Sequence, residues 1–260
     1  MKFTLQILIV LLFVSCTGGT VSKTSNIKKV KKIRNDIDDQ HLKGPVKSFT
    51  VIEYKYVAQS RPDHKQLTSK TIGTFNKDGN LNYMLFYNEY GSLDHKWIYR
   101  YNDKGRKMKM DIYNAYDTLK GIVIYKYDSR GQNIGSGDYT VDSILKKIEI
   151  CKYDEYGNEI EEISLNPDGS LDYRYTKKYD DNGNIIEQQS YHADNKPGSK
   201  VTFYYDEKEN LVEMKYSFRF SVSSVKYKQE NFDKYGNCLK ETSYSNNKPE
   251  NITEQIIEYY

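Results

Sequence analysis

Short stretches of alternating polar and apolar or aromatic residues run through most of the chain, and polar turn motifs separate them. One motif recurs as "FNKDGN" from Phe75, "YNDKGR" from Tyr101, "YDSRGQ" from Tyr127, "YDEYGN" from Tyr153, "YDDNGN" from Tyr179, "YDEKEN" from Tyr205 and "FDKYGN" from Phe232, at a spacing of 26 residues five times and then 27. A second polar turn lies halfway through each unit. The roughly seven residues between turns, at about 3.3 Å each, predict strands of about 23 Å. The pattern therefore predicts two β-strands per repeat.

The recurring turn motif suits a β-hairpin. In "YDDNGN", the Asp180 carboxylate can accept a backbone hydrogen bond two residues on, and Gly183 can adopt the positive φ of a type I turn that is closed by a bulge. The oxygen-rich motif also resembles a calcium loop, but its glycine stands at the fourth place instead of the sixth and no closing glutamate is correctly spaced. We therefore predict a structural role for Asp180 and Gly183.

Consecutive hairpins predict an all-β fold, a long antiparallel β-meander of two-strand repeats. About fourteen to sixteen strands exceed the roughly ten that an open twisted sheet usually holds without curling. We expect a curved single-layer sheet or a partly closed shell with its aromatic face inward. The sequence leaves open whether the sheet closes.

Alternation assigns the strand residues to two faces, and we set the register by pairing the first residue of each turn motif with the residue after the turn glycine. One face is then aromatic, and its candidate ligand-binding residues are Trp97, Tyr99, Tyr101, Tyr125 and Tyr127. The other face carries a basic row that consists of Arg100, Lys126, Lys152 and Lys178. Aromatic residues on strands are more often packing than ligand platforms. A basic row is likewise more often part of a solvated face, where neighbouring glutamates neutralise its positive charge.

The same register places Glu149 opposite Glu162 on the aromatic face, where like charges repel. Such a pair could grip a cation or act as acid and base. The register could instead be off by one at this point, or both side chains could reach solvent at a strand edge. We favour these two structural explanations.

The N-terminus has the form of a secretory signal. One lysine precedes an apolar core of about ten residues, half the length that spans a bilayer. The core ends in "FVSC", which resembles the lipobox of bacterial lipoproteins, in which the cysteine becomes the lipidated N-terminus. We expect a signal peptide over residues 1–15, a lipid anchor at Cys16 with a flexible tether over 16–41, and the repeat domain over 42–260. The alternative is an ordinary cleaved signal with a chance cysteine.

The composition limits the possible functions. The 260 residues include 26 tyrosines, and 39 basic against 36 acidic side chains leave a net charge of only +3. A chain whose positive and negative charges balance so closely lacks the basic patch typical of nucleic-acid-binding proteins. Cys151 and Cys238 lie several repeats apart and could form a disulfide only if the sheet curls back, so we favour two free, packed thiols.

Signatures of catalysis are lacking in the sequence. The four histidines, His41, His64, His95 and His192, have no zinc-like spacing. A serine elbow, a phosphate loop and a dinucleotide fingerprint are also missing. We predict a non-catalytic protein with no metal and no other cofactor.

The motifs "RYNDKGR", "KYDSRGQ", "KYDEYGN" and "KYDDNGN" resemble the tyrosine-aspartate repeats of the RHS/YD family. The acylated, repeat-only layout is similar to the RHS-repeat lipoproteins of Bacteroidota, over roughly residues 42 to 260. The resemblance implies a curled β-shell with a surface or binding role, without the toxin domain of the large family members. With the lipid anchor, it implies the cell envelope, at the outer membrane, with the side undetermined.

Two classes of function follow. As a binding module, the protein would hold a glycan or an extended polymer on the curved tyrosine-rich face. As a structural or interaction scaffold, it would contact an envelope protein through its sheet edges or the basic row, with the aromatic residues as core. Membrane lipid at the acylated Cys16 is a partner in both cases.

Overall fold

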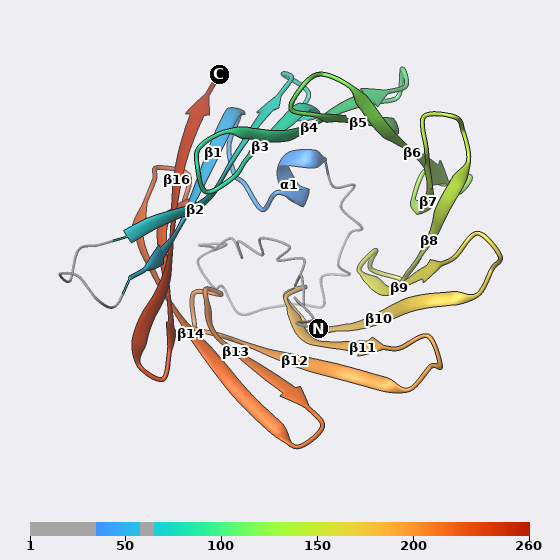
Figure 1. Cartoon of the computed structure of the whole chain (residues 1–260). Helices are drawn as coiled ribbons and strands as arrows, with labels where there is room; N and C mark the ends of the chain where they lie inside the picture. Colours follow the sequence, from blue (N-terminus) through green and yellow to red (C-terminus); the bar gives the residue numbers. More distant parts are fainter. Residues whose placement is uncertain (1–34, 58–64) are drawn as a thin grey trace, which may run out of the picture.

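The computed structural model describes residues 35–57 and 65–260, which form a ring of antiparallel strands around a short helix (Figure 1). The helix α1 spans Asp36–Asp39. The sixteen strands are β1 (Val46–Tyr56), β2 (Lys65–Phe75), β3 (Leu81–Tyr87), β4 (Leu93–Tyr101), β5 (Lys107–Asn114), β6 (Leu119–Tyr127), β7 (Asn133–Tyr139), β8 (Leu145–Tyr153), β9 (Glu159–Leu165), β10 (Leu171–Tyr179), β11 (Ile185–Tyr191), β12 (Pro197–Tyr205), β13 (Leu211–Phe218), β14 (Ser221–Phe232), β15 (Cys238–Ser245) and β16 (Lys248–Tyr259). The expected signal peptide and Cys16 lie outside the described residues.

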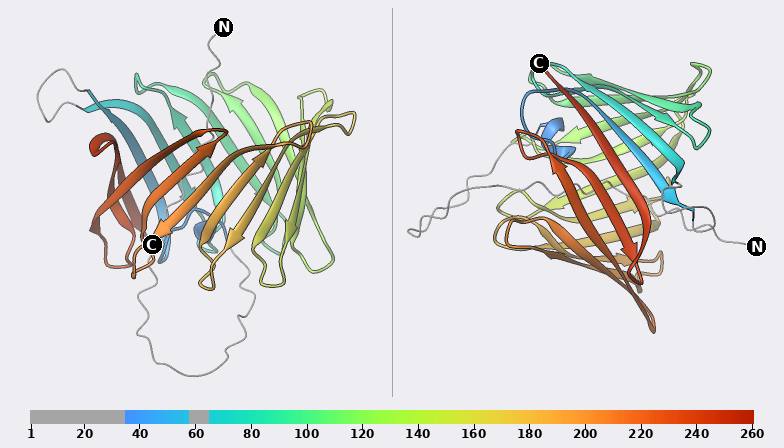
Figure 2. Two further views of the ribbon diagram at one scale, coloured as in Figure 1. Left: turned by 90° about the horizontal axis from the view of Figure 1, so that it is seen from below. Right: turned by 90° about the vertical axis from the view of Figure 1, so that its left-hand side faces the viewer.

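Each strand pairs with the next along the chain, and β1 pairs with β16, so the sheet is a closed barrel. Figure 2 shows that the strands slant relative to the barrel axis, as closure of a sheet requires. The predicted all-β antiparallel meander is confirmed. The sheet closes completely, which goes beyond the partly closed shell that we expected.

The recurring turns have the predicted chemistry. Asp180 Oδ1 accepts hydrogen bonds from the backbone N–H groups of Asn182 (2.9 Å) and Asn184 (2.8 Å). Gly183 has a φ of +89°, in the left-handed region that favours glycine. The structural role predicted for Asp180 and Gly183 is therefore confirmed.

The strand register differs from the predicted one by two residues. Tyr153 pairs with Glu159, one residue further than expected, and a bulge beside it adds another residue. Glu149 therefore faces Ser164, and Glu162 faces Cys151. The predicted direct opposition of Glu149 and Glu162 is wrong because the turn and the bulge absorb two residues. A shift of two residues leaves the assignment of faces unchanged.

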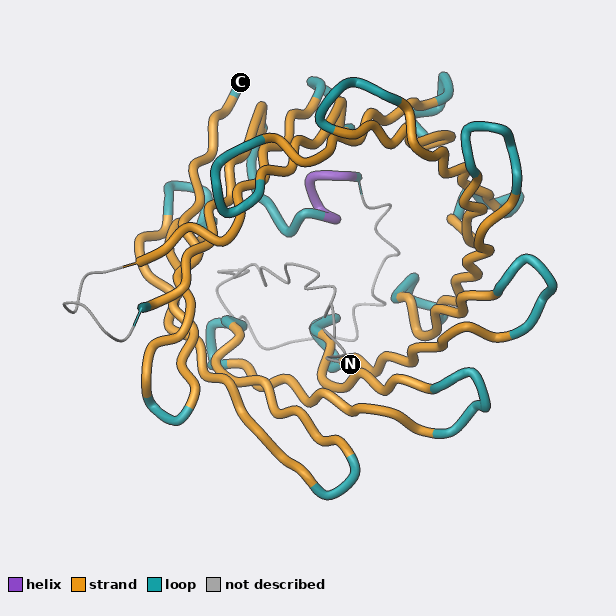
Figure 3. The backbone as a smooth tube through the Cα atoms, in the orientation of Figure 1, coloured by secondary structure: helices purple, strands orange, loops and turns teal. Residues whose placement is uncertain are grey.

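The aromatic face lines the inside of the barrel. Helix α1 lies within the ring of strands (Figure 3), and its Asp36 carboxylate contacts Tyr101 and Lys107. Residues that alternate in step with Tyr101 on β4 therefore point inward. The predicted inward direction of the aromatic face is confirmed.

The tyrosine of the turn motif has a repeated role in this interior. The hydroxyls of Tyr127, Tyr179 and Tyr205 donate to backbone carbonyls twenty residues earlier, at 2.7 to 2.8 Å. Each bond ties the last residue of one strand to the first residue of the strand before it. Buried hydroxyls need such partners, which explains why this position favours tyrosine over phenylalanine.

The last residues of the expected tether, 16–41, are part of the fold. The side chain of Ile37 packs against a buried cluster that includes Val46, Phe49 and Phe75. The cluster is the main apolar core of the barrel and lies on the inner wall of β1 to β3. The expected flexible tether is therefore wrong for residues 36–39, because this segment has a buried partner surface.

Two further observations concern the thiols and the membrane. Cys151 and Cys238 form no disulfide with each other, as we predicted. None of the helices in residues 35–57 and 65–260 is long and apolar enough to cross a membrane.

Candidate binding site inside the barrel

Helix α1 is held against the inner wall by one carboxylate with several partners. Asp36 Oδ2 accepts a hydrogen bond from the Leu81 backbone N–H (2.8 Å) and another from the Tyr101 hydroxyl, while Asp36 Oδ1 lies 2.8 Å from Lys107 Nζ. Asp36 is buried, with 7% of its surface exposed. This ion pair and its hydrogen bonds fix α1 on the wall formed by β3, β4 and β5.

The structure brings the five candidate aromatic residues together on β4 and β6, next to α1. Trp97 and Tyr99 pack against the apolar core, and Lys107 Nζ lies 4.8 Å from the centre of the Tyr99 ring and 5.7 Å from that of Tyr125. Burial raises the pKa of Tyr99, Tyr101 and Tyr125 well above the ordinary range, and that of Tyr127 to about 12. Much of this wall is therefore packed.

A second group of interior residues lies on β8, β9 and β10. The Tyr173 and Tyr175 rings have their centres 5.2 Å apart. The Tyr173 hydroxyl lies 3.4 Å from Glu149 Oε1 and 3.5 Å from Glu162 Oε1. The Glu162 side chain is 28% exposed, so this group is partly accessible. Paired aromatic rings beside carboxylates can stack on a sugar ring and accept hydrogen bonds from its hydroxyls.

Burial and neighbouring carboxylates set the electrostatics of this group. Burial raises the pKa of Glu162, and the nearby Glu159 and Glu149 raise it further, although Lys177 opposes them. The pKa of Asp138 on β7 is raised by burial and by Glu149. Ionisation of Glu162 and Asp138 is therefore unfavourable in the folded protein. A ligand that donates hydrogen bonds to these carboxylates would stabilise their ionised forms.

Replacing Glu162 by glutamine should stabilise the protein at neutral pH by about 0.5–1 kcal/mol, the scale of like-charge repulsion in a sheet. Because the folded pKa of Glu162 is raised, its ionised form destabilises the fold above that pKa. The advantage of Glu162→Gln should shrink as the pH falls through the folded pKa and disappear below the ordinary glutamate pKa. Urea unfolding at several pH values would measure this. A gain that is equal at all pH values would contradict it.

The basic row lies on the outer face, where carboxylates pair with most of it. Asp111 lies 3.0 Å from Arg100 and 2.7 Å from Lys109, Glu161 lies 2.6 Å from Lys152 and 3.2 Å from Arg174, and Glu187 lies 2.9 Å from Lys178 and 2.5 Å from Lys200. Lys126 stands opposite Gly135, and it has no ion pair among the described residues. The outer face is therefore highly charged but locally balanced.

The interior thiol and the histidines give little sign of catalytic chemistry. Burial, with help from Glu159 and Glu162, raises the pKa of the Cys151 thiol to about 12, so the thiol is protonated and a poor nucleophile. His95 Nδ1 lies 2.8 Å from the Asp94 carboxylate in an exposed pair. In the described part of the chain, His, Cys, Asp and Glu form no cluster that could hold a metal ion.

Sequence reasoning missed Asp36, Lys107, Tyr173 and Tyr175. Tyr175 stands three repeats of 26 residues after Trp97, so an alignment of the repeats would have placed it on the same face. Asp36 gave no signal, because the segment around it is charged and has no apolar periodicity.

A comparison with one solved structure supports the fold. No protein-family model matches the chain, and a search of curated proteins finds no match. A porin-like protein from Bacteroides uniformis is similar in structure, with a TM-score of 0.54 at 10% identity over 82% of this chain and 97% of that one. A porin-like protein from Bacteroides vulgatus has a TM-score of 0.47 at 11% identity over 80% and 97%. The TcdB2-TccC3-Cdc42 complex has a TM-score of 0.34 at 17% identity, over 67% of this chain and 10% of that one.

Proposed function

We propose that this protein is a non-catalytic binding barrel that holds a glycan or another extended polymer against tyrosines of its inner face. The observation that carries the proposal is the Tyr173 and Tyr175 pair, whose rings lie beside the half-buried carboxylates of Glu149 and Glu162. The tyrosine rings would stack on sugar rings, and the carboxylates would accept hydrogen bonds from hydroxyls. The wall that carries Trp97 and Tyr99 would serve mainly as core beneath α1.

We further propose that the barrel lies beside a membrane and hangs from it by lipid chains on Cys16. Each buried CH₂ group of such chains contributes about 0.8 kcal/mol, so several chains anchor a protein stably. The charged groups on the outer face, such as Asp111 with Arg100 and Lys109, support this arrangement, because membrane-spanning barrels present an apolar band to lipid. The resemblance to RHS-repeat lipoproteins also supports a place in the cell envelope.

The test of polymer binding is a glycan array, followed by pull-down with insoluble polysaccharides. Replacing Tyr173 and Tyr175 together by alanine should lower affinity for the bound glycan at least tenfold, if each ring contributes on the scale of nucleobase stacking on aromatic side chains, roughly 1–3 kcal/mol. The control is the pair Tyr90→Ala and Tyr116→Ala, because these tyrosines are 82% and 88% exposed on hairpin tips.

The control variant should bind like the parent, and both variants should unfold cooperatively in urea. Equal binding by the folded Tyr173 and Tyr175 variant and by the parent would exclude this site. If the parent binds no glycan on the array, the polymer-binding function itself would be rejected in favour of the scaffold function.

The scaffold alternative has less support from the geometry. It depends on free sheet edges and on a basic face, but the barrel joins β1 to β16 and carboxylates lie beside three of the four residues of the basic row. One interruption in the wall, between β13 and β14, still offers unpaired strand edges.

A further inference from the structure

Strands β13 and β14 separate before they reach one end of the barrel. Their ladder runs from the pair Phe218 and Ser221 to the pair Glu213 and Lys226. Beyond Lys226, β14 continues to Phe232 and pairs with β15. Within the described residues, no ladder joins the segment 227–232 to β13. The barrel wall is therefore open here along one edge of β14.

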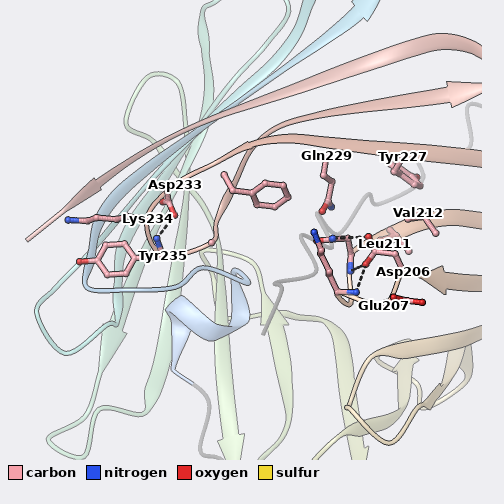
Figure 4. A pocket seen from close by; sticks show the side chains of 13 residues that line it. Asp206, Glu207, Leu211, Val212, Tyr227, Gln229, Asp233, Lys234 and Tyr235 are labelled. Atoms are coloured by element: carbon pink, nitrogen blue, oxygen red, sulfur yellow. Dashed lines mark hydrogen bonds between the residues drawn. The ribbon is translucent and has the colours of Figure 1, made fainter. Parts of the chain in front are cut away.

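A cavity of about 900 Å³ occupies this interruption, which we call the notch (Figure 4). The hairpin tips at 206–210 and 233–236 flank it at one end of the barrel, and Leu211 and Val212 of β13 line it together with residues of the segment 227–232 of β14. Asn231 has a φ of +58° and is absent from the pairing with β15, so the regular part of the free edge is 227–230, about 13 Å long at roughly 3.3 Å per residue. The notch is long enough for a strand of about four residues.

The backbone at the notch can bond to another strand. In a β-strand, alternate residues direct their N–H and C=O groups to opposite sides. Some backbone groups of 227–230 therefore point toward β15, and the others point into the notch. Such an edge is a template for strand addition, in which main-chain hydrogen bonds provide affinity. A glycan offers no row of donors and acceptors at this spacing.

The side chains along the free edge favour an uncharged strand, and the hairpin tips that flank the notch carry charges of both signs, at Asp206, Glu207, Lys208, Asp233 and Lys234. Phe232 is 45% exposed, while Leu211 is buried. Gln229 Nε2 donates to Glu241 Oε2 at 2.9 Å, and Gln229 Oε1 is buried without a hydrogen-bond partner in the described structure. A free amide oxygen of this kind would accept a hydrogen bond from a hydroxyl or amide of an incoming strand. Burial raises the pKa of Glu241, so this region disfavours further negative charge.

We propose that the notch binds an extended, uncharged polypeptide segment of a partner protein, which adds as a strand to the free edge of β14. Apolar side chains of the segment would contact Phe232 and Val212. A small polar side chain would reach Gln229. The notch lies on strands other than those of the proposed polymer site, so either function can exist without the other.

The probe for this site is a capped octapeptide of alternating threonine and valine, and its control is the same peptide with N-methyl groups on alternate backbone amides. N-methylation removes donors but keeps the side chains. We expect the octapeptide to bind in fluorescence anisotropy and the N-methylated peptide to bind at least tenfold more weakly. In hydrogen exchange, amides of 227–232 that are open in the free protein should exchange at least tenfold more slowly with the octapeptide.

A matched pair of variants places the binding on β14. Phe232→Asp puts a charge in the notch and should weaken octapeptide binding at least tenfold. Phe220→Asp changes an exposed phenylalanine just before the other end of β14 and should leave binding unchanged. Four results would overturn the proposal: no binding of the octapeptide, equal binding of the N-methylated peptide, protection of 227–232 already in the free monomer, or a dimer of this chain that protects them.

Discussion

Replacing Asp36 by alanine should lower the free energy of unfolding by about 3–5 kcal/mol, because it leaves the largely buried Lys107 ammonium, whose side chain is 19% exposed, without its counterion. Asp36 also accepts hydrogen bonds from the Leu81 N–H and the Tyr101 hydroxyl, so the substitution leaves these two donors in the interior without their acceptor. Urea unfolding followed by circular dichroism would measure the loss.

The control for Asp36 is Asp117→Asn. Asp117 lies 2.5 Å from Lys96, but its side chain is 74% exposed, so breaking this ion pair should cost less than about 1 kcal/mol. The double variant Asp36→Ala with Lys107→Met should recover much of the stability, because it leaves no unpaired charge. If Asp36→Ala cost no more than Asp117→Asn, the ion pair with Lys107 would not be what holds α1 in the barrel.

Replacing Gly135 by alanine should cost about 4 kcal/mol. Gly135 lies on β7 with a φ of +139°, and a Cβ atom there would lie 2.0 Å from the backbone oxygen of Glu149 on β8. An alanine must therefore push two paired strands apart in addition to adopting an unfavourable backbone conformation. The free energy of unfolding in urea would measure this cost.

Gly169→Ala separates the two contributions to that cost. Gly169 has a φ of +84°, and a Cβ atom there would meet nothing within 4 Å. Alanine at this hairpin should cost only the roughly 1–2 kcal/mol of the left-handed conformation. Similar losses for the two variants would mean that β7 and β8 can move apart freely, contrary to the close approach at Gly135.

The parts of the fold that could be predicted from the sequence are those that depend on neighbouring residues. The turn at Asp180 and Gly183 follows from hydrogen bonds and a backbone angle within one hairpin, and alternation alone placed Tyr99 and Tyr101 on the inner face. The register was wrong by one residue at the turn itself and by a second at the bulge beside Tyr153, which has no distinct sequence signal. Complete closure depends on the twist summed over all strands, which no single repeat encodes.

The candidate site was harder to predict because its two walls have the same repeat pattern. Tyr99 and Tyr175 look alike in the sequence, yet Tyr99 lies in the packed region near α1 and Tyr175 does not belong to it. The difference comes from the apolar cluster on β1 to β3, which packs against Tyr99, and from α1, which the ion pair of Asp36 with the distant Lys107 holds beside it. Long-range contacts of this kind leave no periodic pattern, so the sequence predicted the aromatic inner face but not which part of it is accessible.

Joining β1 to β16 fixes how many repeats the protein can have. In an open array, adding or deleting a unit changes the length and leaves the other units in place. Here Thr50 on β1 pairs with Ile256 on β16, so deletion of one 26-residue unit would remove two strands and force a narrower ring or expose two edges. The tandem repeats of this chain therefore cannot vary in number independently, although each one resembles its neighbours.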